Sequence, residues 1–305
     1  MRLTALLLLL APLPAAAQDT VRTEADGSRT LVTEAIAPAS PAFVWKVIAT
    51  VEGWGSWAAT HAWATDDPDV IETAYAPDAR PGQPGNIRQR IVSREPGRRI
   101  VFRTIKTPEG FPHAAAFMGV THDFEIAPDG SGTRLRLTGT NYPAGEEGDA
   151  LLGFFKRGNR ITIDRLVARL AAEPVEWLVG HCWRGLLPNG AQDTHCFTRG
   201  EDGVHDAHDV LAGGKKVYWG DTLYAWDSGA KALRFAYTAM SGGRMTGHVR
   251  AIPEGLDFGS SDFVGSDGKH QAFVTRWLRI DDNAYDARDE TPGRPAQVVR
   301  YTRID

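Results

Sequence analysis

The chain has 305 residues, of which 42% are hydrophobic and 24% are charged, and its formal net charge is −4. These values are typical of a globular protein, and the length suits about two domains of ~150 residues each. The slightly acidic balance argues against a nucleic-acid-binding surface.

The first 17 residues have the pattern of a secretory signal peptide. Arg2 precedes an apolar run at residues 6–10, and residues 15–17 offer an A-x-A cleavage site. The alternative is an uncleaved anchor, but a membrane span needs about 20 apolar residues. We therefore expect a periplasmic or secreted protein without stable membrane insertion, in a compartment where disulfides persist.

The first half of the mature chain reads as a mixed α/β segment. Ser40 and Pro41 predict a helix start, with an N-cap side chain and a proline at the first helical position. A long amphipathic helix is predicted at residues 146–172, and Pro174 ends it. Strands are predicted at residues 30–37, 69–76, 85–95, 98–106, 115–126 and 134–142.

Three stretches of this half resemble the START-like, or SRPBCC, superfamily. They are VW…GW..W within residues 44–57, PGRRIVFRT at 96–104 and DFEIAPDGSGTRLRLTG at 123–139. The superfamily includes polyketide cyclase/dehydrase-type, Aha1-type and pathogenesis-related ligand-binding proteins. The resemblance covers residues 29–172 and implies an α+β helix-grip fold with an apolar cavity between the sheet and the long helix. It implies no particular activity, because activity depends on the residues of the pocket.

His122 is the candidate catalytic residue of this half. It shares a strand face with Val120 and Phe124, so it would place a polar group in an apolar pocket. An imidazole there can orient a ligand or act as an acid or base; the alternative is a core histidine with a satisfied hydrogen bond. The candidate ligand-binding residues of the first half are Trp54, Trp57, Val120, His122, Phe124 and Phe155.

The second half, residues 175–305, reads as a series of short strands separated by turn signals, among them strands at residues 177–185, 215–220 and 221–227. This pattern predicts an antiparallel barrel or sandwich. The opening WLVGHCWRG at residues 177–185 and the succession of hairpins resemble the lipocalin/calycin type of β-barrel, which implies a second fold that can hold a small molecule. The acidic stretch at residues 281–290 is predicted to be a solvated loop.

The two cysteines, Cys182 and Cys196, flank the first hairpin of this half. A two-residue Asn189-Gly190 turn would place them on opposite faces. A three-residue loop beginning at Pro188 would instead place them directly opposite each other, since proline suits the first position of a type I turn and glycine the left-handed position after it. That second register predicts a Cys182–Cys196 disulfide, because directly opposed residues come within disulfide reach.

The same register places an aromatic face toward the barrel interior. His181 and His195 would be diagonal neighbours there, able to reach a ligand, a metal or haem iron; the alternative is a pair of core histidines. Mixed Cys/His zinc ligation is disfavoured, because adjacent strand residues point to opposite faces. The candidate ligand-binding residues of the second half are His181, Trp183, His195 and Phe197.

These observations favour an exported protein that binds or carries a small hydrophobic or amphipathic molecule, with no cofactor expected and protein partners undefined. The first alternative is a cyclase/dehydratase-type enzyme that uses His122, and the second is metal or haem binding at His181 and His195. The sequence lacks G-x-S-x-G, H-E-x-x-H, P-loop and G-x-G-x-x-G motifs, which argues against the corresponding enzyme classes.

Overall fold

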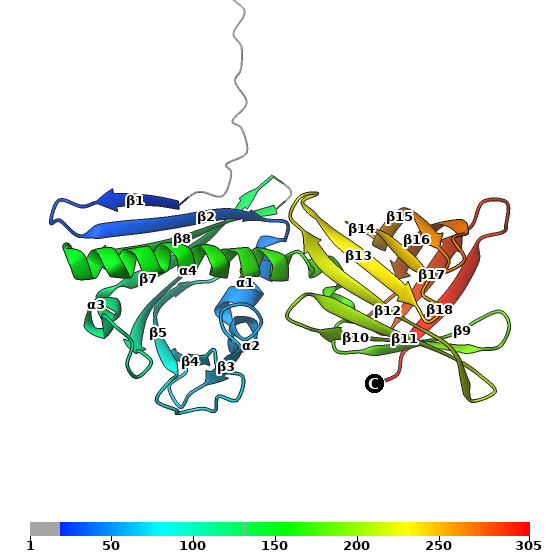
Figure 1. Cartoon of the computed structure of the whole chain (residues 1–305), viewed down its shortest axis with the longest axis horizontal. Helices are drawn as coiled ribbons and strands as arrows, with labels where there is room; N and C mark the ends of the chain where they lie inside the picture. The colour runs from blue at the N-terminus through cyan, green and yellow to red at the C-terminus, as the bar shows by residue number, and fades with distance from the viewer. Residues whose placement is uncertain (1–18, 131) are drawn as a thin grey trace, which may run out of the picture.

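The structure, a computed structural model, describes residues 19–130 and 132–305. It consists of two β-rich halves with the long helix α4 leading from the first toward the second (Figure 1). The predicted signal peptide lies outside the described residues. None of the described helices is both long enough and apolar enough to cross a membrane.

The helices and strands have the following bounds. The helices are α1 (Pro41–Ala49), α2 (Val51–Trp54), α3 (Ala114–Gly119), α4 (Glu146–Leu170) and the 3₁₀ helix η1 (Glu173–Leu178). The strands of the first half are β1 (Asp19–Thr23), β2 (Arg29–Ala37), β3 (His61–Ala64), β4 (Val70–Ala74), β5 (Ile87–Glu95), β6 (Arg99–Lys106), β7 (Thr121–Asp129) and β8 (Gly132–Tyr142). The strands of the second half are β9 (Cys182–Leu186), β10 (Gln192–Arg199), β11 (Val204–Ala212), β12 (Lys215–Asp227), β13 (Ala232–Ala239), β14 (Arg244–Ile252), β15 (Gly255–Val264), β16 (His270–Arg279), β17 (Ala284–Glu290) and β18 (Gln297–Arg303).

The first half is one antiparallel sheet with α4 packed across it. The strand order among the described residues is β1-β2-β8-β7-β6-β5-β4-β3. Apolar side chains of α1, α4 and the sheet, among them Val44, Ile100 and Leu166, form one continuous core. This arrangement confirms the predicted α+β helix-grip class; β1 joins the sheet although the sequence pattern did not indicate a strand there.

The predicted start of α1 is confirmed. The Ser40 hydroxyl accepts a hydrogen bond from the Phe43 amide at 3.2 Å, and Pro41 occupies the first turn. Helix α2 needs a glycine at position 53, because a Cβ atom there would lie 2.0 Å from the Val47 carbonyl oxygen of α1. The indole N–H of Trp54 donates to the Ile48 carbonyl, so α2 is held tightly on α1.

The strand predicted at residues 115–126 is wrong in its first part. Residues 114–119 form the short helix α3, and the strand β7 begins only at Thr121. The three alanines at 114–116 favour a helical turn, and this local preference prevails over the apolar run that suggested a strand.

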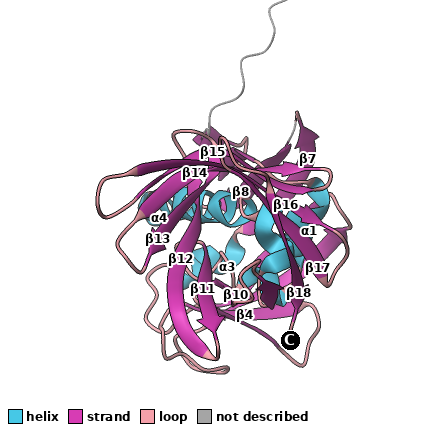
Figure 2. Cartoon of the chain, turned by 90° about the vertical axis from the view of Figure 1, so that its right-hand side faces the viewer, coloured by secondary structure: helices cyan, strands magenta, loops and turns pink. Residues whose placement is uncertain are grey.

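The second half is a closed antiparallel barrel, as predicted. In residues 175–305, all of which the structure describes, ten strands follow one another around the barrel, and β9 closes it by pairing with both β10 and β18. Figure 2 looks toward this half and shows its strands in front of the helices of the first half. The number of strands exceeds the eight of a lipocalin.

Three details of the predicted barrel are corrected. Residues 177 and 178 belong to η1, so the first strand is shorter than expected. The two strands expected within residues 215–227 are one long strand, β12. Residues 284–290 are the strand β17 and not a solvated loop, and Tyr285 and Ala287 are buried in the barrel. The charged residues between and after these two side chains obscured the alternation in the sequence.

The first hairpin of the barrel has the three-residue loop and the disulfide that the sequence predicted. Cys196 pairs directly with Cys182, and their Cα atoms lie 4.1 Å apart. The Leu187 amide donates to the Ala191 carbonyl across the loop, and Gly190 adopts φ +82°. The proline-containing loop therefore determines the register.

The two halves meet where α4 ends. The Glu176 carboxylate in η1 accepts hydrogen bonds from Arg169 of α4 and from Arg199 of β10. Glu173 pairs with Ser40, and the β12 side chain of Trp226 packs against the core of the first half. Polar and apolar contacts thus hold the barrel against the helix-grip half.

We expect loss of the disulfide to destabilise the barrel. In the chain-entropy description, a cross-link that closes a loop of about this length contributes at most ~3 kcal/mol. Urea unfolding of Cys182→Ser/Cys196→Ser should show that loss. Reduced wild-type protein retains both sulfur atoms and should show the same loss, which assigns the effect to the bond and not to the substitutions. Equal free energies of unfolding for oxidised and reduced protein would contradict this prediction.

Candidate functional site

The alternation of side chains along β10 and β11 determines which residues of these strands point into the barrel. On β10, Asp193, His195 and Phe197 point inward, while Cys196 faces its disulfide partner on the other side. On β11, Asp206 and His208 point inward in the same way. The two histidines come from directly paired positions, so the register places both imidazoles at one level of the barrel.

These side chains form one end of a cavity of about 210 Å³ inside the barrel. Aromatic side chains, among them Phe235, Phe258 and Trp277, also line it, and the Trp277 ring lies 5.8 Å from the ring of His195. The cavity therefore combines apolar surface with a polar end. Among the described residues that line it, there are three aspartates and two histidines but neither lysine nor arginine.

His195 lies between two carboxylates. Its Nδ1 atom is 2.8 Å from Asp206 Oδ2, and its Nε2 atom is 3.6 Å from Asp193 Oδ2. Burial by itself lowers the pKa of this imidazole, but the neighbouring carboxylates outweigh burial and raise the pKa of His195 to about 10. Nδ1–H therefore donates to Asp206.

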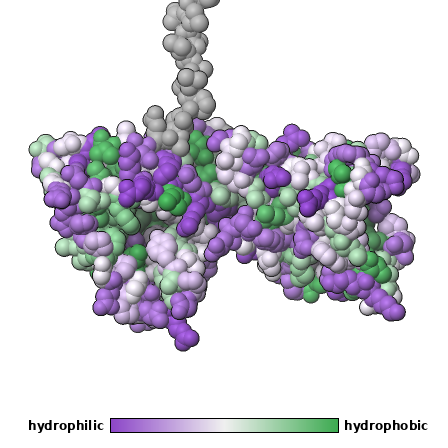
Figure 3. Space-filling model, viewed as in Figure 1, coloured by the Kyte–Doolittle hydropathy of each residue, from purple (hydrophilic) through white to green (hydrophobic). Residues whose placement is uncertain are grey.

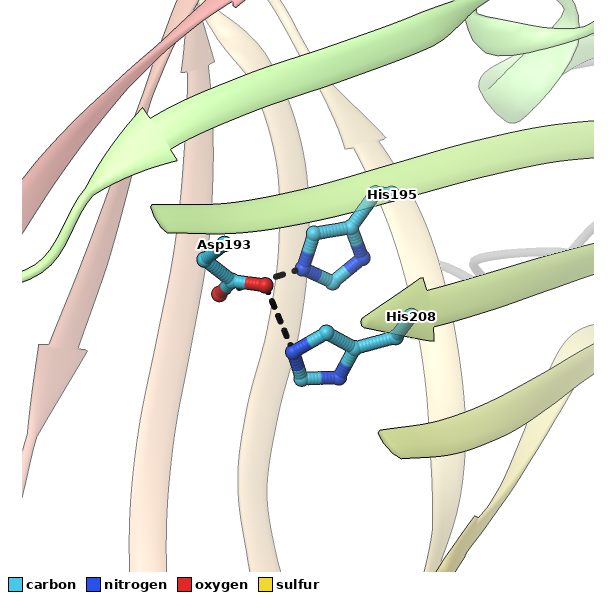
Figure 4. A group of neighbouring side chains, drawn as sticks. All are labelled: Asp193, His195 and His208. Carbon is cyan, nitrogen blue, oxygen red and sulfur yellow. Dashed lines mark ion pairs between the residues drawn. The ribbon is translucent and has the colours of Figure 1, made fainter. Parts of the chain in front are cut away.

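Asp193 is the polar group around which the cavity end is built. The Tyr301 hydroxyl donates to Asp193 Oδ2 at 2.6 Å, and His208 Nε2 lies 2.7 Å from Asp193 Oδ1 (Figure 4). Burial raises the pKa of Asp193, but its hydrogen bonds and the charges of the two histidines hold it well below the usual range. Burial and the Asp193 carboxylate raise the pKa of Tyr301, which keeps that hydroxyl protonated as a donor.

The structure brings together only part of the residue set expected for this half. Trp183 and Phe197 are buried inside the barrel with His195. His181 is not: it pairs with Asp305 at 3.2 Å, and its side chain is 32% exposed. The expected pairing of His181 with His195 is therefore wrong, because Gly180 at φ +86° turns the chain and the strand alternation begins only at Cys182.

The sequence interpretation missed Asp193, Asp206 and His208. The sequence did contain a signal for these residues. Asp193 and His195 are two residues apart and therefore lie on the same strand face, and the same holds for Asp206 and His208. His208 lies three residues from His205 on β11, so the two side chains point to opposite faces of the strand. Its true partner lies on the preceding strand, and only the β10–β11 register identifies it.

The candidate residues of the first half are packed in its core. Trp54, Trp57 and Phe124 belong to the core between α1 and the sheet, and Val120 belongs to a smaller buried cluster against which Phe155 packs. Of these, only Trp57 lines either of the two cavities described here. The structure thus gives most of these side chains a packing role.

His122 stands among aromatic rings. It is 4% exposed, it stacks on Phe102 at a centroid distance of 5.2 Å, and Phe155 lies 5.8 Å away. Burial lowers the pKa of His122 to about 4, so the imidazole is neutral near pH 7.

A second cavity lies between the two halves. It measures about 760 Å³ and opens where the space-filling view is hollowed between them (Figure 3). Trp57 and Arg165 line it from the first half, and Arg199 and Trp226 line it from the barrel. Arg199 is paired with Glu176, so this side chain also contributes to holding the halves together.

Comparisons with known proteins agree with the N-terminal fold. Residues 28–173 match the family described as "Polyketide cyclase / dehydrase and lipid transport". This match supports the predicted resemblance of the first half of the chain to the START-like, or SRPBCC, superfamily. The search of curated proteins found no match.

Several solved structures are similar to part of the chain. The Aha1 dimer from Colwellia psychrerythraea is 14% identical, with a TM-score of 0.34, over 44% of this chain and 91% of that chain. MLL2253 from Mesorhizobium loti is 16% identical, with a TM-score of 0.37, over 46% of this chain and 94% of that chain. CalU16 from Micromonospora echinospora is 18% identical, with a TM-score of 0.34, over 50% of this chain and 87% of that chain.

The burial of His122 predicts a pH-dependent stability. Its pKa is about 4 in the folded protein, against 6.5 for an ordinary histidine. The unfolded chain therefore takes up a proton first, and the stability present above pH 6.5 is lost as the pH falls toward 4. Because one pKa unit corresponds to about 1.4 kcal/mol, the loss between pH 7 and pH 4 is roughly 3 kcal/mol.

Urea unfolding of wild type and His122→Phe over this pH range isolates the contribution. The difference between the two free energies of unfolding should change by the stated amount, whereas His270→Phe, at an exposed position, should retain the wild-type dependence. A parallel pH dependence of wild type and His122→Phe would show that His122 does not cause the loss.

Proposed function

We propose that the protein binds a small amphipathic molecule inside the barrel. The observation that carries this proposal is a cavity that aromatic side chains line together with the Asp193, His195 and His208 side chains. An apolar pocket with a few convergent polar groups is the usual form of a small-molecule site. The apolar part of the ligand would contact Phe258 and Trp277, and its polar group would lie against the Asp193 end.

The size of the cavity limits the ligand. Its volume of about 210 Å³ is below the ~300–1,000 Å³ of sites for drug-sized molecules. We therefore propose a compact molecule with few non-hydrogen atoms, and not a long acyl chain or a polycyclic compound. The absence of lysine and arginine from the described lining disfavours an anionic ligand.

The helix-grip half, proposed to span residues 29–172, would support this site from outside. The family that this half matches is described with the words "lipid transport". Most of the candidate pocket residues of this half, however, are packed in its hydrophobic core. The cleft between the halves then serves as the second place where an amphipathic ligand could lie, with Trp57 and Trp226 as its apolar surface. The residues from 175 to 305 would form the ligand-holding domain.

We further propose that the protein works outside the cytoplasm. The disulfide between Cys182 and Cys196 supports this location, since such bonds persist in oxidising compartments. The signal-peptide pattern of the first 17 residues agrees with it.

The enzyme alternative would use His122 as an acid or base. Its low pKa leaves a neutral imidazole able to accept a proton, but this side chain lines neither cavity described here. Binding in the barrel is therefore the better-supported function, and His122→Phe should leave it unchanged.

Filling the barrel cavity should abolish binding. Ser261 is 7% exposed and lines the cavity, so Ser261→Leu places three further carbon atoms into the ligand space. Ser260→Leu makes the same change on the opposite, exposed face of β15 and is the matched control. With 4-fluorobenzyl alcohol as the probe, ligand-observed ¹⁹F NMR should show at least tenfold weaker binding for Ser261→Leu only.

Native mass spectrometry of the protein purified from its own cells should reveal a co-purified molecule of compatible size in wild type and in Ser260→Leu. Equal probe binding by all three proteins would place the ligand elsewhere, and no binding by wild type would refute the proposal.

A further inference from the structure

Three side chains at the polar end of the barrel cavity present metal-ligating atoms to one point. Asp193, His195 and His208 each offer one such atom, and these atoms all lie within 4.8 Å of one another. Figure 4 shows the two imidazoles reaching from adjacent strands toward the same carboxylate. The cluster lies inside a closed barrel and not on the surface, where acidic groups often gather without a metal.

We propose that Asp193, His195 and His208 bind a divalent first-row transition-metal ion, with at least one coordination position open to the cavity. Two imidazoles and one carboxylate are a ligand set typical of zinc and of non-haem iron. Both cysteines of the chain are held in the disulfide, so nitrogen and oxygen are the available donors. This ligand set differs from the His181 and His195 pair suggested by the sequence.

The backbone register prearranges the two nitrogen ligands. His195 and His208 are direct cross-strand partners, and their rings stack at a centroid distance of 4.2 Å. Tetrahedral bonds of about 2.1 Å require ligand atoms about 3.4 Å apart. Small side-chain rotations therefore bring the ligand atoms to this spacing, and no strand has to move. The ion takes the place of the proton on Nε2 of His195, which is released to solvent on binding.

Neighbouring groups orient the ligands in the way that outer-shell partners of metal sites do. Asp206 binds Nδ1 of His195, which leaves Nε2 directed toward Asp193. Tyr301 donates to Oδ2 of Asp193, which leaves Oδ1 directed toward His208. A carboxylate on the far nitrogen of a ligating histidine fixes its tautomer and raises its basicity.

Two buried polar atoms lack a hydrogen-bond partner at the point where the ion would lie. Asp193 Oδ1 and His208 Nε2 are 2.7 Å apart, but their relative orientation does not satisfy hydrogen-bond geometry. Buried polar groups are normally paired. A cation between Asp193 and the two imidazoles would satisfy both atoms at once.

The charges around the cluster favour a cation. Asp193 and Asp206 are 5% and 1% exposed, and Asp289 adds a third carboxylate to the cavity wall. Among the described residues lining the cavity, the two histidines can offset only part of the charge of three carboxylates, and the lining includes neither lysine nor arginine. A divalent ion supplies positive charge where the barrel concentrates negative charge.

This inference rests on the proposed function in that both use the barrel cavity. Three protein ligands with an open position are typical of sites where a metal contacts a ligand or water, whereas purely structural zinc sites have four. The ion would therefore hold the polar group of the molecule whose apolar part contacts the aromatic side chains.

Titration of the untagged, oxidised full chain with Zn²⁺ tests the proposal. After removal of bound metal with a chelator, isothermal titration calorimetry should show one ion per chain. His208→Gln and Asp193→Asn should weaken binding by at least 100-fold. Asp206→Asn should weaken it by about 10- to 100-fold, as expected for the loss of an outer-shell partner. His181→Gln is the matched control and should bind as wild type does.

Co²⁺ provides a second readout that does not depend on the stability of any variant. Wild-type protein loaded with Co²⁺ should show visible d–d absorption that excess Zn²⁺ removes. No binding of Zn²⁺ or Co²⁺ by wild type would overturn the proposal and leave a metal-free ion-pair network. Loss of binding in His181→Gln with retention in His208→Gln would also overturn it.

Binding of 4-fluorobenzyl alcohol to the chelator-treated protein and to the Zn²⁺-treated protein separates this inference from the proposed function. Binding of the probe without binding of metal refutes the metal site alone. Binding of metal, with no binding of the probe by either form of the protein, refutes the proposed ligand site alone.

Discussion

The register of the hairpin β9–β10 is the constraint on which the barrel depends. A shift by one residue would send every inward side chain of a strand to the outside. The loop at Pro188 and the bond between Cys182 and Cys196 exclude that shift. With β10 fixed in this way, its pairing with β11 brings His195 opposite His208. The polar end of the cavity is thus a consequence of backbone geometry established at one hairpin of the closed barrel.

The two halves use their apolar residues differently. In the helix-grip half, bulky rings such as Trp54 and Phe124 fill the space between the sheet and its helices. In the barrel, aromatic side chains fill the end near η1, and the remaining interior stays open as a cavity. A barrel with more strands has a wider interior. Side chains therefore fill this interior less completely than they fill the narrow space under α4. The hollow in the barrel follows from this difference in shape.

Local sequence rules predicted the features that depend on neighbouring residues. The N-cap at Ser40, the three-residue loop at Pro188 and the disulfide all follow from residues close in sequence or directly opposed across one turn. Features that depend on distant pairing were predicted poorly. The strand β17 was hidden by its charged residues, and His208 acquires its role only through a neighbouring strand. The prediction for His181 was wrong because Gly180 turns the chain and the strand alternation begins only at Cys182.

The indole of Trp226 belongs to the barrel strand β12 but packs against the core of the helix-grip half. Cutting the chain between α4 and β9 would leave an uncovered apolar patch on the N-terminal fragment and an exposed indole on the barrel. A cut after Glu176 would separate Arg199 from this carboxylate, whereas a cut before Glu176 would keep the ion pair within the barrel fragment. An expression boundary placed between the halves would therefore expose apolar surface on both fragments, and such surface favours aggregation.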